Sequence, residues 1–273
     1  MNIKMGYFLL CNYALSFNNK MLLHNSIGLL SKKLSTKKNT LYAKLSKKLE
    51  LSNENIFKNN YTPKTEAQKN YKRSLYNPDV NLLFCLGPAG TGKTLFACQH
   101  AIESLNKGTT KKIIITRPTI AIEEDMGFLP GDIREKMHPW TIPIFDIFQE
   151  YYTKKDINSL INENVIEIAP LGFMQGRTFK NSIIIADEMQ NSTPNQMFML
   201  LTRLGDKSKM VVTGDLMQTT NHKNGLNDIV QKLNIRYQTE EELINNGINI
   251  VKLGSVDVQR HPIVAKITEL YKQ

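Results

Sequence analysis

The stretch NLLFCLGPAGTGKTLFACQHAIESL, residues 81–105, joins three local patterns in one continuous segment. Its apolar start, NLLFCL, predicts a buried strand, and a glycine-rich turn follows directly. Residues 93–105 then predict a helix, which Gly108 ends. A strand, a glycine-rich turn and a helix in this order indicate an α/β fold.

The same alternation continues along the chain. Further strands are predicted at residues 111–116, 164–169, 182–187, 209–215 and 248–253. Helices are predicted in WTIPIFDIFQEYY (140–152) after Pro139 and Pro143, from Pro194 to Gly205, and over residues 261–271. Buried strands between helices predict a mainly parallel sheet flanked by helices, whose ligands bind at the carboxyl ends of the strands.

The glycine-rich turn fits the pattern G-x-x-x-x-G-K-[ST] at every fixed position. It consists of Gly87, Pro88, Ala89, Gly90, Thr91, Gly92, Lys93 and Thr94. Such a loop wraps a phosphate with its amide groups, and the following helix adds partial positive charge. We expect Lys93 to reach the β- and γ-phosphates of a nucleotide and Thr94 to hold Mg²⁺. The alternative is a chance glycine-rich turn.

Two adjacent carboxylates end the strand in IIIADEMQN, residues 183–191. A P-loop enzyme needs an acidic residue at the end of a neighbouring strand to position Mg²⁺, and Asp187 has that place. Glu188 is suited to orient or deprotonate an attacking water, which would convert nucleotide binding into hydrolysis. Solvated acids at an exposed strand end are the alternative.

After the next strand, VVTGDLMQ (211–218) is similar to the γ-phosphate-sensing motif of superfamily 1 helicases. Together with GPAGTGKT, TRPTIAIEEDMGFLPGDIREKMHPW, QGRTF and DVQRHPIV, it resembles the PhoH family over residues 62–273. That resemblance implies a P-loop NTPase with a RecA-like sheet, which binds ATP and Mg²⁺ and hydrolyses the nucleotide.

The resemblance also implies roles at five matching positions. Gln68 would select adenine, and Gln218 would contact the terminal phosphate. Arg177 would contact a nucleic-acid backbone. Arg117 would contact that backbone or support the nucleotide site, and it has a plain ion pair as its alternative. Arg260 would stabilise the transferred phosphate, from the same subunit or a neighbour; alternatively, it ties down the last helix.

Charge separates a basic N-terminal extension, residues 1–60, from an ATPase domain, residues 61–273. Residues 1–49 hold nine of the 35 basic residues and none of the 25 acidic ones, so the body is nearly neutral. A lysine-rich extension attracts phosphate backbones, but a solvated flexible tail or an organellar targeting segment has the same composition. No apolar run is long enough to span a bilayer, and the three scattered cysteines fit a reducing, cytoplasmic setting.

Two functional hypotheses follow. The first is an ATPase that couples hydrolysis to binding or remodelling RNA or single-stranded DNA. The second is a nucleotide-switched binding or assembly protein that hydrolyses ATP slowly and moves nothing. Because the chain carries one motor domain, we expect a homo-oligomer, with a hexameric ring as the attractive form.

Overall fold

The computed structural model describes residues 61–118, 133–218, 224–259 and 263. The chain divides into two units, residues 1–54 and 55–273, and all of the described residues lie in the second. The predicted N-terminal extension, residues 1–60, and most of the predicted closing helix therefore lie outside the described residues.

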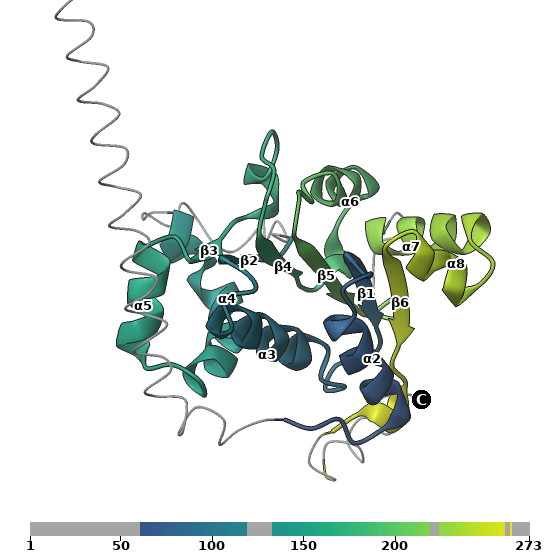
Figure 1. Ribbon diagram of the computed structural model, residues 1–273, viewed down its shortest axis with the longest axis horizontal. Helices are drawn as coiled ribbons and strands as arrows, with labels where there is room; N and C mark the ends of the chain where they lie inside the picture. Colours follow the sequence, from purple (N-terminus) through teal and green to yellow (C-terminus); the bar gives the residue numbers. More distant parts are fainter. Residues whose placement is uncertain (1–60, 119–132, 219–223, 260–262, 264–273) are drawn as a thin grey trace, which may run out of the picture. The chain divides into compact units, whose positions relative to one another are not determined.

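One sheet of six parallel strands forms the centre of the described part of the chain (Figure 1). The strands are β1 (Leu82–Leu86), β2 (Lys112–Thr116), β3 (Ile166–Ile168), β4 (Ser182–Ala186), β5 (Lys209–Gly214) and β6 (Ile248–Lys252). Their order across the sheet is β3-β2-β4-β5-β1-β6. Each strand lies within two residues of its predicted bounds, so the predicted parallel sheet is confirmed.

Helices cover both faces of this sheet. The α-helices are α2 (Glu66–Tyr76), α3 (Lys93–Asn106), α4 (Ile133–Gln149), α5 (Lys154–Asn162), α6 (Pro194–Leu201), α7 (Gly225–Arg236) and α8 (Glu240–Asn245). Short 3₁₀ turns are η2 (Leu171–Phe173), η3 (Met189–Asn191) and η4 (Ser255–Asp257). Figure 1 shows α3 on one side of the sheet and α6 and α7 on the other. None of the helices in the described ranges is both long and apolar enough to span a bilayer.

The prediction that α4 starts after its prolines is wrong. The helix begins at Ile133 and includes both Pro139 and Pro143. A proline inside a helix costs about 3 kcal/mol, but α4 packs against α3 and buries Ile144 and Phe148 completely or nearly so. Tertiary burial on that scale can offset the cost of an internal proline.

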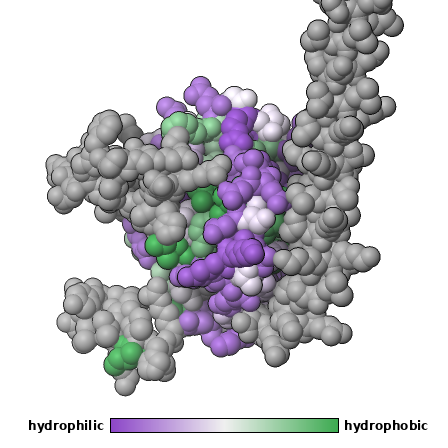
Figure 2. Space-filling model, turned by 90° about the vertical axis from the view of Figure 1, so that its left-hand side faces the viewer, coloured by the Kyte–Doolittle hydropathy of each residue, from purple (hydrophilic) through white to green (hydrophobic). Residues whose placement is uncertain are grey.

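Helices α5, α7 and α8 were not predicted. In α5, the Thr153 side chain accepts a hydrogen bond from the Asp156 amide and caps the amino terminus. Ile157 and Leu160 lie on its buried face. Figure 2 shows the side of the molecule on which α5 lies, where hydrophilic residues form a broad band. The helix is therefore an ordinary amphipathic one, and it is only nine residues long.

The register of the sheet sets the position of the site. Leu86 at the end of β1 pairs with Gly214 at the end of β5, and Ala186 of β4 pairs with Val212 of β5. On one face, alternate strand residues pack with α6 and α7 in a continuous core that includes Phe84 and Leu86. The segments that follow β1, β4 and β5 therefore emerge side by side at one edge of the sheet, the edge formed by the carboxyl ends of the strands.

Lys209, the first residue of β5, joins the amino-terminal ends of the strands to α2. Its ammonium donates to the carbonyl oxygens of Ser74, Leu75 and Asn77 at 3.2, 2.7 and 2.8 Å. A lysine in this place satisfies the last carbonyls of the helix and complements its dipole. Burial lowers the pKa of Lys209 to about 8.

We expect Lys209→Met to lower the free energy of unfolding at neutral pH by about 1–3 kcal/mol, because charged hydrogen bonds to the helix end are lost. Between pH 8 and 10.5 the unfolded lysine keeps its proton while the folded one loses it. Wild-type stability should therefore rise with pH relative to the variant across this window. Urea unfolding at several pH values measures both effects, and parallel pH profiles of the two proteins would contradict the second.

Candidate nucleotide-binding site

The loop between β1 and α3 needs glycine at three places, and one of them is Gly90, with φ at 83°. A Cβ on Gly87 would lie 2.4 Å from the backbone oxygen of Leu253, in the segment after β6. Gly92 has a φ of 88°, in the left-handed region, and is the N-cap of α3. The loop is thus fixed between neighbouring strands, and the Gly87 amide donates to the Gly214 carbonyl at 3.0 Å.

The inner surface of this loop is rich in hydrogen-bond donors. In the described ranges, no group accepts a hydrogen bond from the amides of residues 90–94, which form the end of the loop and the start of the 14-residue helix α3. The Lys93 ammonium donates to the carbonyl oxygens of Gly87 and Pro88 at 2.6 and 2.8 Å. Several unused amides, a helix amino terminus and a lysine fit a bound phosphate group.

Asp187 joins the loop to the acidic strand. The Thr94 hydroxyl donates to Oδ1 of Asp187 at 2.7 Å, and the Thr213 hydroxyl donates to the same atom at 2.5 Å. Asp187 is 6% exposed. The hydroxyl of Thr94 and the carboxylate of Asp187 are the oxygen ligands that Mg²⁺ prefers, so the residues fit that ion. The residues described contain no cluster of three or more His, Cys, Asp or Glu side chains able to hold a metal.

Thr213, which the sequence did not single out, lies on β5 between the loop and Asp187. Its hydrogen bond fixes the Asp187 carboxylate from the side opposite to solvent, because Thr213 is fully buried. Outer partners of this kind orient metal-binding carboxylates. Only the strand order shows that Thr213 orients Asp187, because threonine is a common residue in strands.

We expect Thr213→Val, which keeps the shape and removes the hydroxyl, to raise the Mg²⁺ concentration needed for nucleotide binding by about 10- to 100-fold. Titration of Mg²⁺ against binding of a fluorescent ATP analogue measures the effect. Thr202→Val, at the end of α6, is the matched control and should bind as the wild type does. An unchanged Mg²⁺ dependence in Thr213→Val would remove Thr213 from the site.

Glu188 directly follows Asp187 and has a left-handed backbone, with φ at 55°. Its Oε2 accepts a hydrogen bond from Nε2 of Gln190 at 2.5 Å, and its Oε1 lies 3.7 Å from Nη2 of Arg117. The buried Gln190 also accepts a hydrogen bond from the Asp215 amide at 3.2 Å. Gln190, also missed from sequence, therefore connects Glu188 to the segment that follows β5.

Gln218 lies in that same segment after β5, and its contact with a terminal phosphate stays a prediction. Its amide donates to the Asp215 carbonyl at 3.2 Å, and its side chain is exposed. Asp215 is buried, and its Oδ1 accepts a hydrogen bond from the Met217 amide at 2.9 Å. The turn is thus fixed by Asp215, and Gln218 is presented at the edge of the sheet where the loop and Glu188 emerge.

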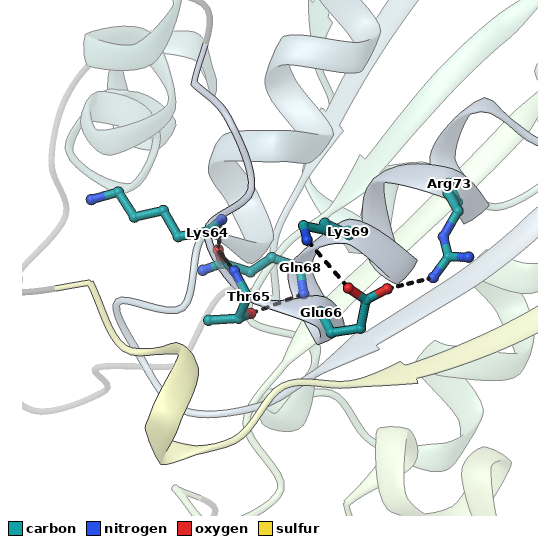
Figure 3. Close-up of polar contacts among 6 residues, drawn as sticks. All are labelled: Lys64, Thr65, Glu66, Gln68, Lys69 and Arg73. Carbon is teal, nitrogen blue, oxygen red and sulfur yellow. Dashed lines mark hydrogen bonds and ion pairs between the residues drawn. The ribbon is translucent and has the colours of Figure 1, made fainter.

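Gln68, in the first turn of α2, lies behind the phosphate loop rather than in open solvent. Figure 3 shows it beside Thr65, whose hydroxyl caps the helix. Its Nε2 donates to the carbonyls of Thr91 and Asp257, both at 3.1 Å, and its Oε1 accepts from the Lys64 amide at 2.8 Å. Gln68 therefore ties α2, the loop and η4 together, and an adenine-selecting role for it stays a prediction.

Tyr71, one turn further along α2, supports the same loop and was not predicted. Its hydroxyl donates to the Lys93 carbonyl at 2.9 Å. Burial raises the pKa of Tyr71 well above its usual value, so the phenol stays a neutral donor at any physiological pH. Gln68 and Tyr71 together fasten one face of α2 to the start of α3.

Arg177, one of the predicted arginines, does not lie beside the phosphate loop. Arg177 precedes β4 and pairs with Glu167 of β3 at 2.6 Å, while its guanidinium lies 4.6 Å from the ring centre of Phe179. Because β2, β4 and β5 lie between β3 and β1 in the sheet, Arg177 is remote from the phosphate loop. Arg260 lies outside the described residues.

A family model described as "PhoH-like protein" matches residues 60–272. The chain is 39% identical over 249 residues to a PhoH-like protein of Bacillus subtilis, covering 86% of this chain and 75% of that one. It is 40% identical to a PhoH-like protein of Synechocystis (77% and 62% covered) and 35% identical to Protein PhoH of Escherichia coli (76% and 57% covered). The chain thus spans less than two thirds of the last two relatives.

The chain also matches solved structures of helicases. One is described as two Pif1 helicases coordinating in DNA unwinding (19% identity, TM-score 0.33, 77% of this chain and 48% of that chain covered). Another is Bacteroides Pif1 bound to single-stranded DNA (18% identity, TM-score 0.33, 77% and 46% covered). On the family match and the identities to its relatives, the chain belongs to the PhoH-like family of P-loop nucleotide-binding proteins.

Proposed function

We propose that this protein is a Mg²⁺-dependent ATPase. The observation that carries the proposal is the 2.7 Å hydrogen bond between Thr94 of the phosphate loop and Asp187, with Glu188 next to it. Phosphate-binding groups, a metal-binding pair and a carboxylate able to act on water lie together at one edge of the sheet. A protein that only bound nucleotide would not need the third of these.

In this mechanism, the loop amides and Lys93 bind the β- and γ-phosphates and neutralise charge as the reaction proceeds. Mg²⁺, when held by Thr94 and Asp187, supplies a further positive charge to the phosphate oxygens. Glu188 orients a water and takes its proton. The oxygen of that water bonds to the terminal phosphorus, the bond from phosphorus to the ADP oxygen breaks, and the proton passes to solvent.

We further propose that hydrolysis is coupled to RNA or single-stranded DNA. Support comes from the helicase-like order of motifs and from the lysine-rich residues 1–49. The test is ATP turnover by the full chain, alone and with single-stranded RNA or DNA, in parallel with Glu188→Gln. A rate raised many-fold by one polymer and lost in the variant is expected; a rate that ignores both polymers would contradict the coupling.

One observation favours the second candidate, a nucleotide-switched binding protein. Both arginines predicted to contact nucleic acid are next to carboxylates of the chain itself: Arg117 next to Glu188 and Arg177 next to Glu167. Such pairs reduce the local positive charge available to a polymer. A slow rate unaffected by polymers, together with partner binding that depends on ATP, would favour this candidate.

Assembly into a homo-oligomeric ring would let a neighbour supply Arg260 to the transferred phosphate. Mixing Arg260→Ala subunits with Lys93→Ala subunits tests this. In a ring, some Arg260→Ala sites would face an intact Arg260, so the mixture should regain activity that neither variant has. Mixtures as inactive as the separate variants would argue against supply between subunits.

A further inference from the structure

The Glu188 carboxylate is held from two sides. Gln190, which is 3% exposed, donates to Oε2 from the interior. Arg117 approaches Oε1 from the outside, and the Arg117 and Glu188 side chains are 23% and 36% exposed. The interior contact is a hydrogen bond, whereas the 3.7 Å outer contact is an ion pair that solvent reaches. Another partner can therefore replace the Arg117 contact more easily than the Gln190 contact.

The sheet, rather than a long loop, brings Arg117 to Glu188. Thr116 at the end of β2 pairs with Ala186 at the end of β4, and the Asp187 amide donates to the Thr116 carbonyl at 2.9 Å. Arg117 is the next residue after Thr116, and Glu188 is the next after Asp187. The two side chains thus start from fixed, neighbouring backbone positions, so the pairing is built into the register.

We propose that Arg117 restrains Glu188 until a phosphate of single-stranded nucleic acid takes the carboxylate's place on the guanidinium. This inference rests on the proposed ATPase function and gives it a regulatory link. A guanidinium binds a carboxylate and a phosphodiester through the same planar set of N–H donors. A phosphate that reaches Arg117 from solvent competes directly with Glu188.

Release changes what Glu188 can do. While Oε1 faces Arg117 and Oε2 faces Gln190, both oxygens are engaged by protein groups. Once Arg117 turns to a phosphate, Oε1 is free to orient a water. Gln190 still holds the other oxygen and is bonded in turn to the Asp215 amide, in the segment that carries Gln218. The freed carboxylate therefore stays anchored beside the predicted γ-phosphate sensor.

The direction in which one substitution changes the basal rate of ATP hydrolysis tests this inference. Arg117→Ala should raise the kcat for ATP without polymer by up to about fivefold. A partly exposed ion pair can shift the balance between restrained and released Glu188 by about that factor. The same variant should lose stimulation by oligothymidylate and oligouridylate, while its KM for ATP stays unchanged. Arg117→Lys, which keeps a charge but not the planar donor set, should fall between the variant and the wild type.

Arg73→Ala is the matched control, because Arg73 also pairs with a glutamate of the chain, Glu66, at 3.1 Å (Figure 3). Its basal rate and its stimulation should equal those of the wild type. A rise in both arginine variants would point to a general charge effect and overturn the inference.

The remaining outcomes separate the inference from the function it rests on. A basal rate in Arg117→Ala equal to or below that of the wild type overturns the restraint, even if the wild type hydrolyses ATP well. A raised basal rate with no response of the wild type to either polymer overturns the release by nucleic acid and leaves the ion pair as a simple restraint. No turnover in either protein overturns both the restraint and the ATPase function.

Discussion

Replacing Glu188 by glutamine should lower kcat for ATP hydrolysis by about 10²- to 10⁴-fold, the usual contribution of a positioned general base. The amide cannot take a proton from water, but it has nearly the shape of the carboxylate. Thr94, Asp187 and the phosphate loop keep their own contacts, because none of their described hydrogen bonds goes to Glu188. Nucleotide affinity should therefore change little.

Single-turnover hydrolysis and equilibrium binding of ATP, measured on the same preparation, separate the two effects. Glu188→Asp is an informative companion, since it keeps the charge but shortens the reach to Gln190 and to the water. It should retain more activity than the glutamine variant. If Glu188→Gln hydrolyses ATP as the wild type does, another group activates the water and the assignment of Glu188 is wrong.

The parts of the site that could be predicted from sequence are those set by adjacent residues. The glycines, lysine and threonine of Gly87–Thr94 directly follow a buried strand, so the loop can be identified without knowing the fold. Asp187 can be identified for a similar reason, because a charged residue seldom follows directly after a buried strand. Both interpretations needed only local patterns.

The parts that could not be predicted depend on which strands are neighbours. Thr213 acts on Asp187 because β5 lies beside β4, and Gln190 acts on Asp215 across the same pair of strands. The partner of Arg117 likewise follows from the pairing of β2 with β4. No pattern within a window of a few residues contains that information.

The missed helices show a different limit. Thr153, Asn224 and Thr239 each cap a helix through the side chain, and such residues are recognised starting signals. These signals precede helices of 9, 12 and 6 residues, so α5, α7 and α8 could have been proposed from their caps. For α4 the local signal points the wrong way, because two prolines lie inside a helix that packing against α3 stabilises.

Replacing Lys93 by alanine should have the second large effect, lowering kcat/KM for ATP by about 10²- to 10³-fold or more, through the loss of one preorganised positive charge at the phosphates. In the structure its ammonium bonds to the carbonyls of Gly87 and Pro88, within the loop itself. A bound phosphate would offer that ammonium a charged partner in their place. Binding should therefore weaken along with turnover, unlike in Glu188→Gln.

Thermal unfolding with and without Mg²⁺-ATP distinguishes the two variants, because a ligand that binds only the folded state raises the melting temperature. The wild type and Glu188→Gln should both be stabilised by the nucleotide, while Lys93→Ala should not. Lys93→Arg keeps the charge on a larger, planar group that the loop cannot enclose in the same way, so a partial shift is expected. Equal stabilisation of Lys93→Ala and the wild type would mean that the nucleotide is held elsewhere on the chain. The loop amides of residues 90–94 would then need another occupant, since they lie at a helix amino terminus without an acceptor in the described part of the protein.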